Sequence, residues 1–434
     1  MVRTREAGFL AILFFFEGLA VQAELGDSWR ATTTSAPWER RDRHVAIAFD
    51  QRLFVLGGWW DGGGPLNDVW SSTEGRLWTQ TTAPWQARAD HQAVVFDGKL
   101  WIVGGQISGG FKNDVWFSEN GTSWTLATTA APWTARAYHR VVVHDGKLFL
   151  LGGIDPSVRS DVWQSADGVS WAQVTASAPW GPRELFSATT FNGKIWVLGG
   201  IVSTSRVNDV WSSDNGVTWI LETAGASWPA RASHECAVMD GKIWLLGGER
   251  GAEGPQNDVW CSADGTSWTL ATSAAAWADR FLHACAVFDR RLWVVGGNTI
   301  MRVNDVWFSG PDEPNYTLYP VDGSLDFGTR DVAEGASPPQ SFTLYNDGFA
   351  PLEFSSCEMS GPGEQEFLFT SSPDLSPLAP GTSRSFSLVF DPTFPGLKQV
   401  LLRLYVNDPD VFASLTLNAF ATGTTGTKDW QRYE

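Results

Sequence analysis

Short hydrophobic runs that end in a pair of glycines recur through the first two-thirds of the chain. The run Lys99–Val103 before Gly104 and Gly105 is typical, because its β-branched and aromatic residues favour a packed strand and glycine can end it. The spacing between successive pairs is 47 to 49 residues. The pairs are Gly57/Gly58, Gly104/Gly105, Gly152/Gly153, Gly199/Gly200, Gly247/Gly248 and Gly296/Gly297. This period predicts six copies of one structural unit.

Each unit has the pattern of four short strands. In the second copy, the first strand lies within Arg88–Phe96, after an Arg-x-x-His start. Asp97–Gly98 accepts positive φ at both positions and predicts a tight hairpin into the second strand, Lys99–Val103. Asn113–Trp116 opens the third strand, and Ser123–Leu126 opens the fourth. The pattern predicts an all-β fold with short connections.

The phase of the repeats predicts how the units close into a ring. Six Gly-x-x-Trp turns mark the starts of fourth strands, and the first, Gly26–Trp29, comes before any glycine pair. The last Asn-Asp-Val-Trp motif, Asn304–Trp307, has no such turn after it. We therefore expect the segment around Trp29 to pair beside that motif as the missing outer strand, which would remove two open strand edges. The prediction is a six-bladed β-propeller closed by an N-terminal strand.

These repeats resemble the kelch-repeat family of β-propellers. The resemblance rests on the glycine pairs, the paired aromatics such as Trp116 and Trp124, and the arginine before each first strand, and it covers residues 26 to about 309. We set the propeller domain at residues 24–310. Kelch propellers include binding scaffolds, a copper oxidase of sugars and a sialic acid mutarotase, so the fold does not select a function. Tyr138 is the one tyrosine before residue 316, which argues against the tyrosine-ligated copper site.

A second module follows a linker at residues 311–316. Short strands separated by turn residues predict a β-sandwich over residues 317–422, followed by a flexible tail at residues 423–434. The expected strands are Ser324–Phe327, Gln340–Tyr345, Ser383–Phe390, Gln399–Val406 and Ala413–Ala419.

This module resembles the Hydin-type immunoglobulin-like domain of bacterial exported proteins. The resemblance rests on Leu325–Gly328, Leu344–Gly348 with the following Ala350–Leu352, Leu378–Gly381, Phe386–Pro392 and Asn407–Pro409, which occur in that order. It implies a spacer or adhesive module without chemistry of its own.

The N-terminus has the three parts of a secretory signal peptide. Arg3 and Arg5 form a basic start, residues 8–16 an apolar run, and Val21–Ala23 a small-residue cleavage site. The alternative, a membrane anchor, would need an apolar run of about 20 residues. We expect residues 1–23 to be removed and the protein to be secreted or to lie in the periplasm or cell envelope.

Composition narrows the range of partners. The formal net charge of −17 argues against nucleic acid as a ligand, because nucleic-acid binding needs basic surface. No other segment is long and apolar enough to span a membrane. Cys236 and Cys285 occupy the same place in consecutive repeats, where small core residues stand elsewhere, and we do not expect them to form a disulfide. The remaining partners are a protein or a glycan.

One arginine per repeat follows each crossing between units and has two interpretations. A ring of guanidinium groups at the channel mouth could bind a carboxylate or phosphate, or each arginine could bond to scaffold carbonyls and carboxylates. A repeated residue favours the scaffold role, and both readings stay open. The candidates are Arg41, Arg88, Arg136, Arg183, Arg231 and Arg280.

Residues that differ between repeats at a fixed place are better candidates for ligand contact. The position two beyond each arginine holds Arg43, Asp90, Tyr138, Leu185, Ser233 and Leu282. The resemblance implies that this position and the one just after each glycine pair face the pocket, together with neighbours in the variable loops between second and third strands. From these loops we select Trp59, Trp60, Gln106, Glu249, Arg250 and Asn298. Trp59 and Trp60 could stack on a sugar or a partner, or pack against their own loop.

Five histidines share one repeat position, three after the arginine, where the fourth repeat has Phe186. Symmetry spreads these histidines around a ring, whereas metal ligands must converge, so we expect neither a metal nor another cofactor. The favoured hypothesis is an exported, non-catalytic binding or adhesion protein. The alternative is a carbohydrate-active enzyme, mutarotase-like or glycosidase-like, that uses a carboxylate at the channel mouth. Its candidate acids are Asp90, Glu184, Glu235 and Glu249.

Overall fold

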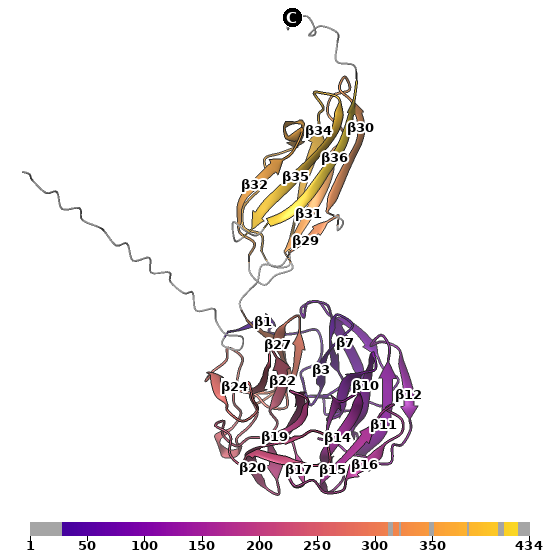
Figure 1. The fold of residues 1–434 in the computed structure, drawn as a ribbon, viewed down its shortest axis with the longest axis vertical. Helices are drawn as coiled ribbons and strands as arrows, with labels where there is room; N and C mark the ends of the chain where they lie inside the picture. Colours follow the sequence, from indigo (N-terminus) through magenta and orange to yellow (C-terminus); the bar gives the residue numbers. More distant parts are fainter. Residues whose placement is uncertain are drawn as a thin grey trace, which may run out of the picture. The chain divides into compact units, whose positions relative to one another are not determined.

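The computed structural model describes residues 28–310, 316–320, 323–346, 351–379, 382–406 and 412–423 (Figure 1). The chain separates into two compact units, one with the strands from β1 to β28 and the other with those from β29 to β36. The expected signal peptide, all but the last residue of the expected linker and all but the first of the expected tail lie outside the described residues. Among the described residues, no helix has the length and apolar character needed to cross a membrane.

Residues 28–310 form six antiparallel sheets of four or more strands. The first three sheets contain β3 (Val45–Phe49), β4 (Arg52–Leu56), β7 (Asp68–Ser72) and β8 (Thr79–Thr82); β9 (Gln92–Phe96), β10 (Lys99–Ile107), β11 (Gly110–Ser118) and β12 (Trp124–Thr128); and β13 (Arg140–His144), β14 (Lys147–Ile154), β15 (Val158–Ser165) and β16 (Ala172–Thr175). The fourth and fifth sheets contain β17 (Arg183–Glu184), β18 (Ser187–Phe191), β19 (Lys194–Val202), β20 (Ser205–Ser213) and β21 (Ile220–Thr223); and β22 (Glu235–Met239), β23 (Lys242–Leu246), β24 (Val259–Ser262) and β25 (Thr269–Thr272). The sixth sheet contains β26 (Ala284–Phe288), β27 (Arg291–Asn298) and β28 (Arg302–Ser309), together with β1 (Trp29–Thr33), β2 (Arg41–Asp42), β5 (Trp59–Trp60) and β6 (Gly64–Pro65) from the start of the chain. The all-β prediction is confirmed.

The hairpin between the first two strands of the second repeat forms as predicted. Asp97 and Gly98 have φ values of 48° and 67°, and β9 pairs with β10 on either side of them. The variable connections expected after the glycine pairs are shorter than expected in four repeats. There the second and third strands continue past the glycines with a register shift, as between Val103 and Gly105, and meet in tight hairpins. A bulge allows this because two residues on one strand can face one on the other.

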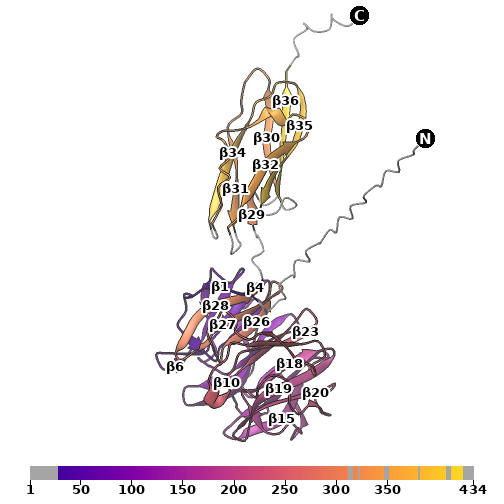
Figure 2. The same cartoon turned by 90° about the vertical axis from the view of Figure 1, so that its left-hand side faces the viewer.

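The innermost strands of the six sheets form a closed series. Each contacts the next in the order β3, β9, β13, β18, β22 and β26, and β26 contacts β3 again. In Figures 1 and 2 the sheets are arranged around a common centre. Most apolar clusters of this unit join two neighbouring sheets, such as the cluster that holds Trp85 between the first and second and the one that holds Trp133 between the second and third. The core therefore lies between the sheets rather than within one.

The N-terminal strand β1 pairs antiparallel with β28, as the phase of the repeats predicted. Trp29 is opposite Ser309, and Ala31 is opposite Trp307. Trp29 is 6% exposed, and its ring meets that of Trp277 edge-on at 5.7 Å between centroids. The end of the first unit is thus fixed to its beginning by backbone hydrogen bonds and by aromatic packing.

The second unit contains two four-stranded sheets that share one apolar core. One sheet has the order β29-β31-β34-β33, and the other has the order β30-β36-β35-β32 with a parallel β30–β36 pair. The strands are β29 (Tyr316–Tyr319), β30 (Ser324–Asp331), β31 (Gln340–Asn346), β32 (Phe354–Ser360), β33 (Phe367–Phe369), β34 (Ser383–Phe390), β35 (Gly396–Val406) and β36 (Phe412–Thr422). The five predicted strands are present. β29, β32 and β33 were missed because two are very short and β32 has no regular apolar alternation.

Candidate functional site

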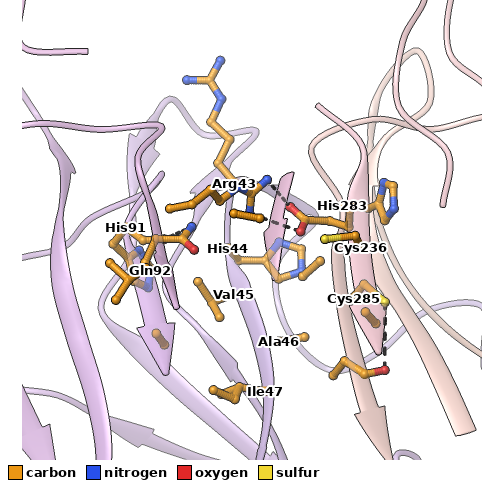
Figure 3. A pocket seen from close by; sticks show the side chains of 18 of the residues that line it. Arg43, His44, Val45, Ala46, Ile47, His91, Gln92, Cys236, His283 and Cys285 are labelled. Atoms are coloured by element: carbon orange, nitrogen blue, oxygen red, sulfur yellow. Dashed lines mark hydrogen bonds and ion pairs between the residues drawn. The ribbon is translucent and has the colours of Figure 1, made fainter. Parts of the chain in front are cut away.

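A cavity of about 380 Å³ lies between the innermost strands of the first unit. Residues from β3, β9, β13, β18, β22 and β26, together with the residues just before these strands, form its wall. Figure 3 shows Arg43, His44, Val45, Ala46 and Ile47 following one another down one side of this wall. The cavity thus extends from the predicted mouth into the channel.

The six residues two positions beyond the repeated arginines form the rim of this cavity. All six line it, and all have the left-handed backbone conformation, with φ between 52° and 59°. Backbone hydrogen bonds link neighbouring members around the mouth, for example from the N–H of Asp90 to the carbonyl of Arg43 (2.9 Å) and from the N–H of Arg43 to that of Leu282 (3.0 Å). The rim residues are Arg43, Asp90, Tyr138, Leu185, Ser233 and Leu282.

This backbone conformation costs about 1 kcal/mol or more for a residue other than glycine. The chain nevertheless has no glycine at any of the six rim positions. The repeat imposes the conformation through the hydrogen bonds around the mouth, while it leaves the side chain free to differ.

The rim is polar on the side of the first three repeats. Arg43 Nη1 lies 3.6 Å from Asp90 Oδ2, and Arg43 Nε lies 3.8 Å from Asp42 Oδ1. The guanidinium carbon of Arg43 is 6.0 Å from the Trp59 ring centroid and 5.9 Å from that of Tyr138. Burial raises the pKa of Asp90 to about 7, although nearby Arg43 opposes this shift. The carboxyl of Asp90 therefore changes charge near neutral pH.

Deeper in the cavity, an ion pair connects two strands that are not neighbours. Arg140 on β13 donates two hydrogen bonds to Glu235 on β22, at 3.1 and 2.9 Å, and its Nε donates to the carbonyl of Phe186 (2.6 Å). Burial raises the pKa of Glu235, and Arg140 opposes this. Arg140 was not predicted, although its position also differs in every repeat and so carried the same signal as the rim.

Two cysteines also line the cavity. Cys236 and Cys285, predicted as small core residues, are half-buried in its wall, and neither forms a disulfide. Burial raises the pKa of the Cys236 thiol to about 12, so this thiol stays protonated at neutral pH.

The repeated arginines are buried and bonded within the scaffold, the role that their repetition favoured, and do not form a binding ring at the mouth. Each is at most 1% exposed, and each donates two hydrogen bonds to the aspartate of the Asn-Asp-Val-Trp motif in its own repeat, which is Ser-Asp-Val-Trp in the third repeat. Each also donates to the carbonyl of the first glycine of the pair. The ligand-binding interpretation is therefore corrected to the scaffold alternative for Arg41, Arg88, Arg136, Arg183, Arg231 and Arg280.

The repeated histidines are buried packing residues. The Cε1 atom of His139 lies 3.0 Å from where a Cβ of Gly104 would stand, and Phe186 has the same contact with Gly152 at 3.3 Å. Burial lowers the pKa of His44 and of His139 to about 3, and the adjacent repeated arginine contributes. No group of three or more histidine, cysteine, aspartate or glutamate side chains among the described residues is placed to hold a metal ion.

The other predicted contact residues lie at the same end of the ring but do not line the cavity. They are Trp59, Trp60, Gln106, Glu249, Arg250 and Asn298. Trp59 and Trp60 are half-buried, and Trp60 packs on its own loop, where a Cβ on Gly62 would lie 2.0 Å from its ring. Gln106 forms a backbone bridge with Ala89.

Three further predicted contacts are engaged with other side chains in the loops. Glu249 pairs with Arg206 at 2.6 Å, and Arg250 pairs with Glu253 at 2.7 Å. The side-chain amide of Asn298 donates to Asp42 Oδ2 (3.3 Å). These loop residues therefore already have partners among the described side chains.

Comparison with known proteins gives one family. The model of the KLHDC2/KLHL20/DRC7 Kelch-repeats domain matches residues 21–153 and 165–297, more than half of the chain. No curated protein matches the sequence. The matched segments contain all six glycine pairs and most of the strands around the cavity. The chain therefore belongs to the Kelch-repeat family, and its first unit is a kelch-type β-propeller.

Proposed function

We propose that the protein is an exported, non-catalytic binding or adhesion protein that takes its partner at the cavity end of a six-bladed propeller. Kelch domains generally bind proteins, which supports a partner of this kind. The six sheets, the closed series of inner strands and the β1–β28 pair support the six-bladed reading. The basic, apolar and small-residue segments of residues 1–23 support export.

The divergence of the rim is the observation that carries this proposal. The arginines, histidines and glycine pairs repeat because they bond or pack within the scaffold. The rim residues share one strained backbone conformation yet differ in charge, size and polarity. Strained backbone positions are common at functional sites. At the rim the scaffold fixes the backbone conformation but does not require a particular side chain, so the side chains are free to serve a ligand.

The second unit is proposed to be an immunoglobulin-like carrier for the propeller. Two four-stranded sheets with a shared core support this reading, as do the turn motifs of the sequence. In this arrangement the sandwich would act as a spacer, and binding would depend on the propeller alone.

The experiment replaces rim side chains without disturbing the backbone. Leu185→Gly and Leu282→Gly remove side chains at positions where glycine adopts the required φ without strain. Proteins captured by the full chain from the extracellular fraction of its source would be identified and purified, and their affinity for each variant measured. Asp145→Asn is the matched control, because Asp145 has φ of 46° in an exposed hairpin at the far end of the inner strand.

We expect the two glycine variants to unfold at the same temperature as the wild type or higher, and to bind the purified partner at least tenfold more weakly. The control should bind like the wild type. Unchanged affinity in both glycine variants would refute the cavity end as the binding face.

A carbohydrate-active enzyme remains the second candidate because of Asp90. A buried carboxyl that titrates near pH 7 suits general acid–base chemistry. Glu235 in the same cavity would be the second carboxyl of a glycosidase-like pair. Incubation with sugars followed by product analysis tests this candidate: an altered or cleaved sugar, formed by the wild type and not by Asp90→Asn, would favour the enzyme over the binding protein.

A further inference from the structure

Buried charged atoms without hydrogen-bond partners gather at one side of the cavity mouth. Among the described residues of the first unit they belong to Asp42, Arg43, Asp90 and Arg302, whereas the other unpartnered buried atoms are on histidine, tryptophan and serine side chains spread over the repeats. Oδ2 of Asp90 is buried and accepts no hydrogen bond of normal geometry from a described residue. The Tyr138 side chain is near enough to act on Asp90 as a hydrogen-bond donor and lower its pKa. Nε of Arg43 is also buried and donates to no described acceptor. The repeated arginines a few residues away are, by contrast, fully engaged with their aspartates. Because a buried group left without a partner costs about 1–3 kcal/mol, this concentration needs an explanation.

Arg43 and Asp90 are close enough to act on one ligand. Nη1 of Arg43 lies 3.6 Å from Oδ2 of Asp90, which is an ion-pair distance but too long for a hydrogen bond. A ligand group beside them would have to accept from the guanidinium and donate to the carboxylate. A hydroxyl group does both. Neighbouring hydroxyls on one ligand could satisfy both residues at once.

The charges in the cavity disfavour a cationic ligand or an anionic one. Above pH 7, where Asp90 is ionised, the carboxylates of Asp90 and Glu235 balance the guanidinium groups of Arg43 and Arg140 within the wall. An ammonium group placed on Asp90 would lie close to Arg43, and a carboxylate placed on Arg43 would lie close to Asp90 and Asp42. Either like-charge contact is unfavourable at such short range.

The remaining wall has both polar and apolar parts. Tyr138 and Ser233 bring hydroxyl groups to the rim, whereas Leu185 and Leu282 bring apolar side chains. A volume of about 380 Å³ is within the range of small-molecule sites. A ligand that fits this lining is compact, uncharged and rich in hydroxyl groups, with an apolar face that can contact an aromatic ring or leucine.

We propose that the cavity binds a neutral saccharide, whose hydroxyl groups accept hydrogen bonds from Arg43 and donate them to Asp90 while its ring packs against Tyr138 and the rim leucines. The proposal rests on the cavity being the binding site, and it names the chemistry of the ligand. The saccharide is either a free sugar or a glycan carried by a partner.

Saccharide binding should depend on pH through Asp90. The groups that act on this carboxyl are Arg43 and Asp42 from its first-repeat side and Tyr138 and Arg140 from the third repeat. A hydroxyl donates a stronger, charge-assisted hydrogen bond to the carboxylate than to the protonated acid. Since the pKa of Asp90 is about 7, the ionised fraction falls about tenfold between pH 8 and pH 6. The affinity for the sugar should fall by a similar factor.

The test measures binding of uncharged methyl glycosides to the full chain by calorimetry at pH 8 and pH 6. Methyl glycosides cannot interconvert anomers, so binding is seen apart from mutarotation. Glucuronic acid and glucosamine serve as the anionic and cationic probes. Asp90→Asn keeps an acceptor oxygen and suits the left-handed backbone, and Asp145→Asn is the control at the far hairpin.

We expect at least one neutral glycoside to bind, with about tenfold lower affinity at pH 6 than at pH 8. Asp90→Asn should bind about tenfold more weakly than the wild type at pH 8 and lose most of the pH dependence, while Asp145→Asn should match the wild type. Binding of the charged sugars alone, equal binding by Asp90→Asn, or stronger binding at pH 6 would overturn the proposal.

A second arm separates the two sources of the sugar and the two proposals. A partner protein would be measured before and after enzymatic removal of its glycans, with the free glycoside as competitor. Loss of binding after deglycosylation identifies a carried glycan, and glycoside binding with no such loss identifies a free sugar. A partner that still binds through the rim leucines, with no glycoside bound and no competition, would refute the saccharide while leaving the proposed binding face intact.

Discussion

The buried histidines should make the propeller sensitive to acid, and His139→Phe isolates the contribution of one of them. His139 is fully buried, its Nε2 lies 3.2 Å from the carbonyl of Val103, and its ring faces Trp133. The fourth repeat shows that phenylalanine fits this position, because Phe186 is equally buried and faces Trp180 in the same way. The substitution therefore preserves the packing and removes a titrating group.

The size and sign of the effect follow from the pKa of His139. Burial, which is the largest cause, and the positive charges of Arg136 and Arg140 lower this pKa from 6.5 to about 3. The hydrogen bond to the Val103 carbonyl and the charge of Asp161 oppose this shift only in part. The unfolded chain thus binds a proton between pH 6.5 and pH 3 that the folded chain does not. Stability is unaffected above this window and is lost as the pH falls through it, by about 2 kcal/mol at pH 5.

Loss of the hydrogen bond to Val103 acts in the other direction and does not depend on pH. It should cost about 1 kcal/mol. His139→Phe should therefore be about 1 kcal/mol less stable than the wild type at pH 8 and about 1 kcal/mol more stable at pH 5, with the two curves crossing near pH 6. The reciprocal variant, Phe186→His, should become more sensitive to acid by a similar amount.

Urea unfolding followed by tryptophan fluorescence measures these differences in the propeller, because all but one of the 25 tryptophans lie between Trp29 and Trp307. The midpoint would be compared at pH 8, 6 and 5. A stability difference between His139→Phe and the wild type that is the same at pH 8 and pH 5 would show that the buried histidine does not resist protonation, and the reasoning would fail.

Three further predictions concern the scaffold, each measured as a change in the free energy of unfolding in urea. Arg231→Leu should cost about 3–5 kcal/mol because it leaves a largely buried aspartate without its partner, whereas Arg250→Leu, in an exposed pair, should cost less than about 1 kcal/mol. Gly248→Ala should cost more than Gly241→Ala, because a Cβ on Gly248 would stand 2.6 Å from a histidine Cβ and one on Gly241 meets no described atom within 4 Å. Trp29→Ala should cost about 3–5 kcal/mol and weaken the β1–β28 closure; a loss below about 1 kcal/mol would mean that closure does not depend on this ring.

The sequence predicted the fold best where a strand or turn recurs in every repeat, or where one repeat lacks a strand that the others have. Pairing of Trp29 with the last sheet could be predicted because one outer strand was absent at the end of the repeats and one was in surplus at the start. Hairpins such as Asp97–Gly98 were predictable because their conformation depends on two adjacent residues. The continuation of strands past the glycine pairs was not, because glycine can end a strand or bulge it and the choice depends on the partner strand.

The site was predictable in part, for a related reason. Arg43, Asp90 and Tyr138 were identified because their position differs between repeats, and the cavity wall contains all three. For Arg88 two roles fitted the same pattern, and the choice depended on whether Asp114 came within hydrogen-bond distance. Arg140 and Glu235 occupy the same position in the third and fifth repeats, but the repeat does not show that these two side chains pair across non-adjacent strands.

The rim shows how a symmetric scaffold can carry an asymmetric site. Backbone hydrogen bonds around the mouth require the same φ from rim residues of different repeats, and they do so whatever the side chain is. Glycine would satisfy this requirement with the least strain, although it loses more conformational entropy on folding. The six side chains are retained against a strain of about 1 kcal/mol or more each, and two of them, Arg43 and Asp90, also hold buried atoms without described partners. Each cost also occurs elsewhere in the propeller, as left-handed hairpin residues and as unpartnered ring nitrogens of repeated histidines and tryptophans, but the mouth combines both on charged side chains. The repeated arginines are fully bonded, which is the distribution expected when the scaffold is selected for stability and the mouth for binding.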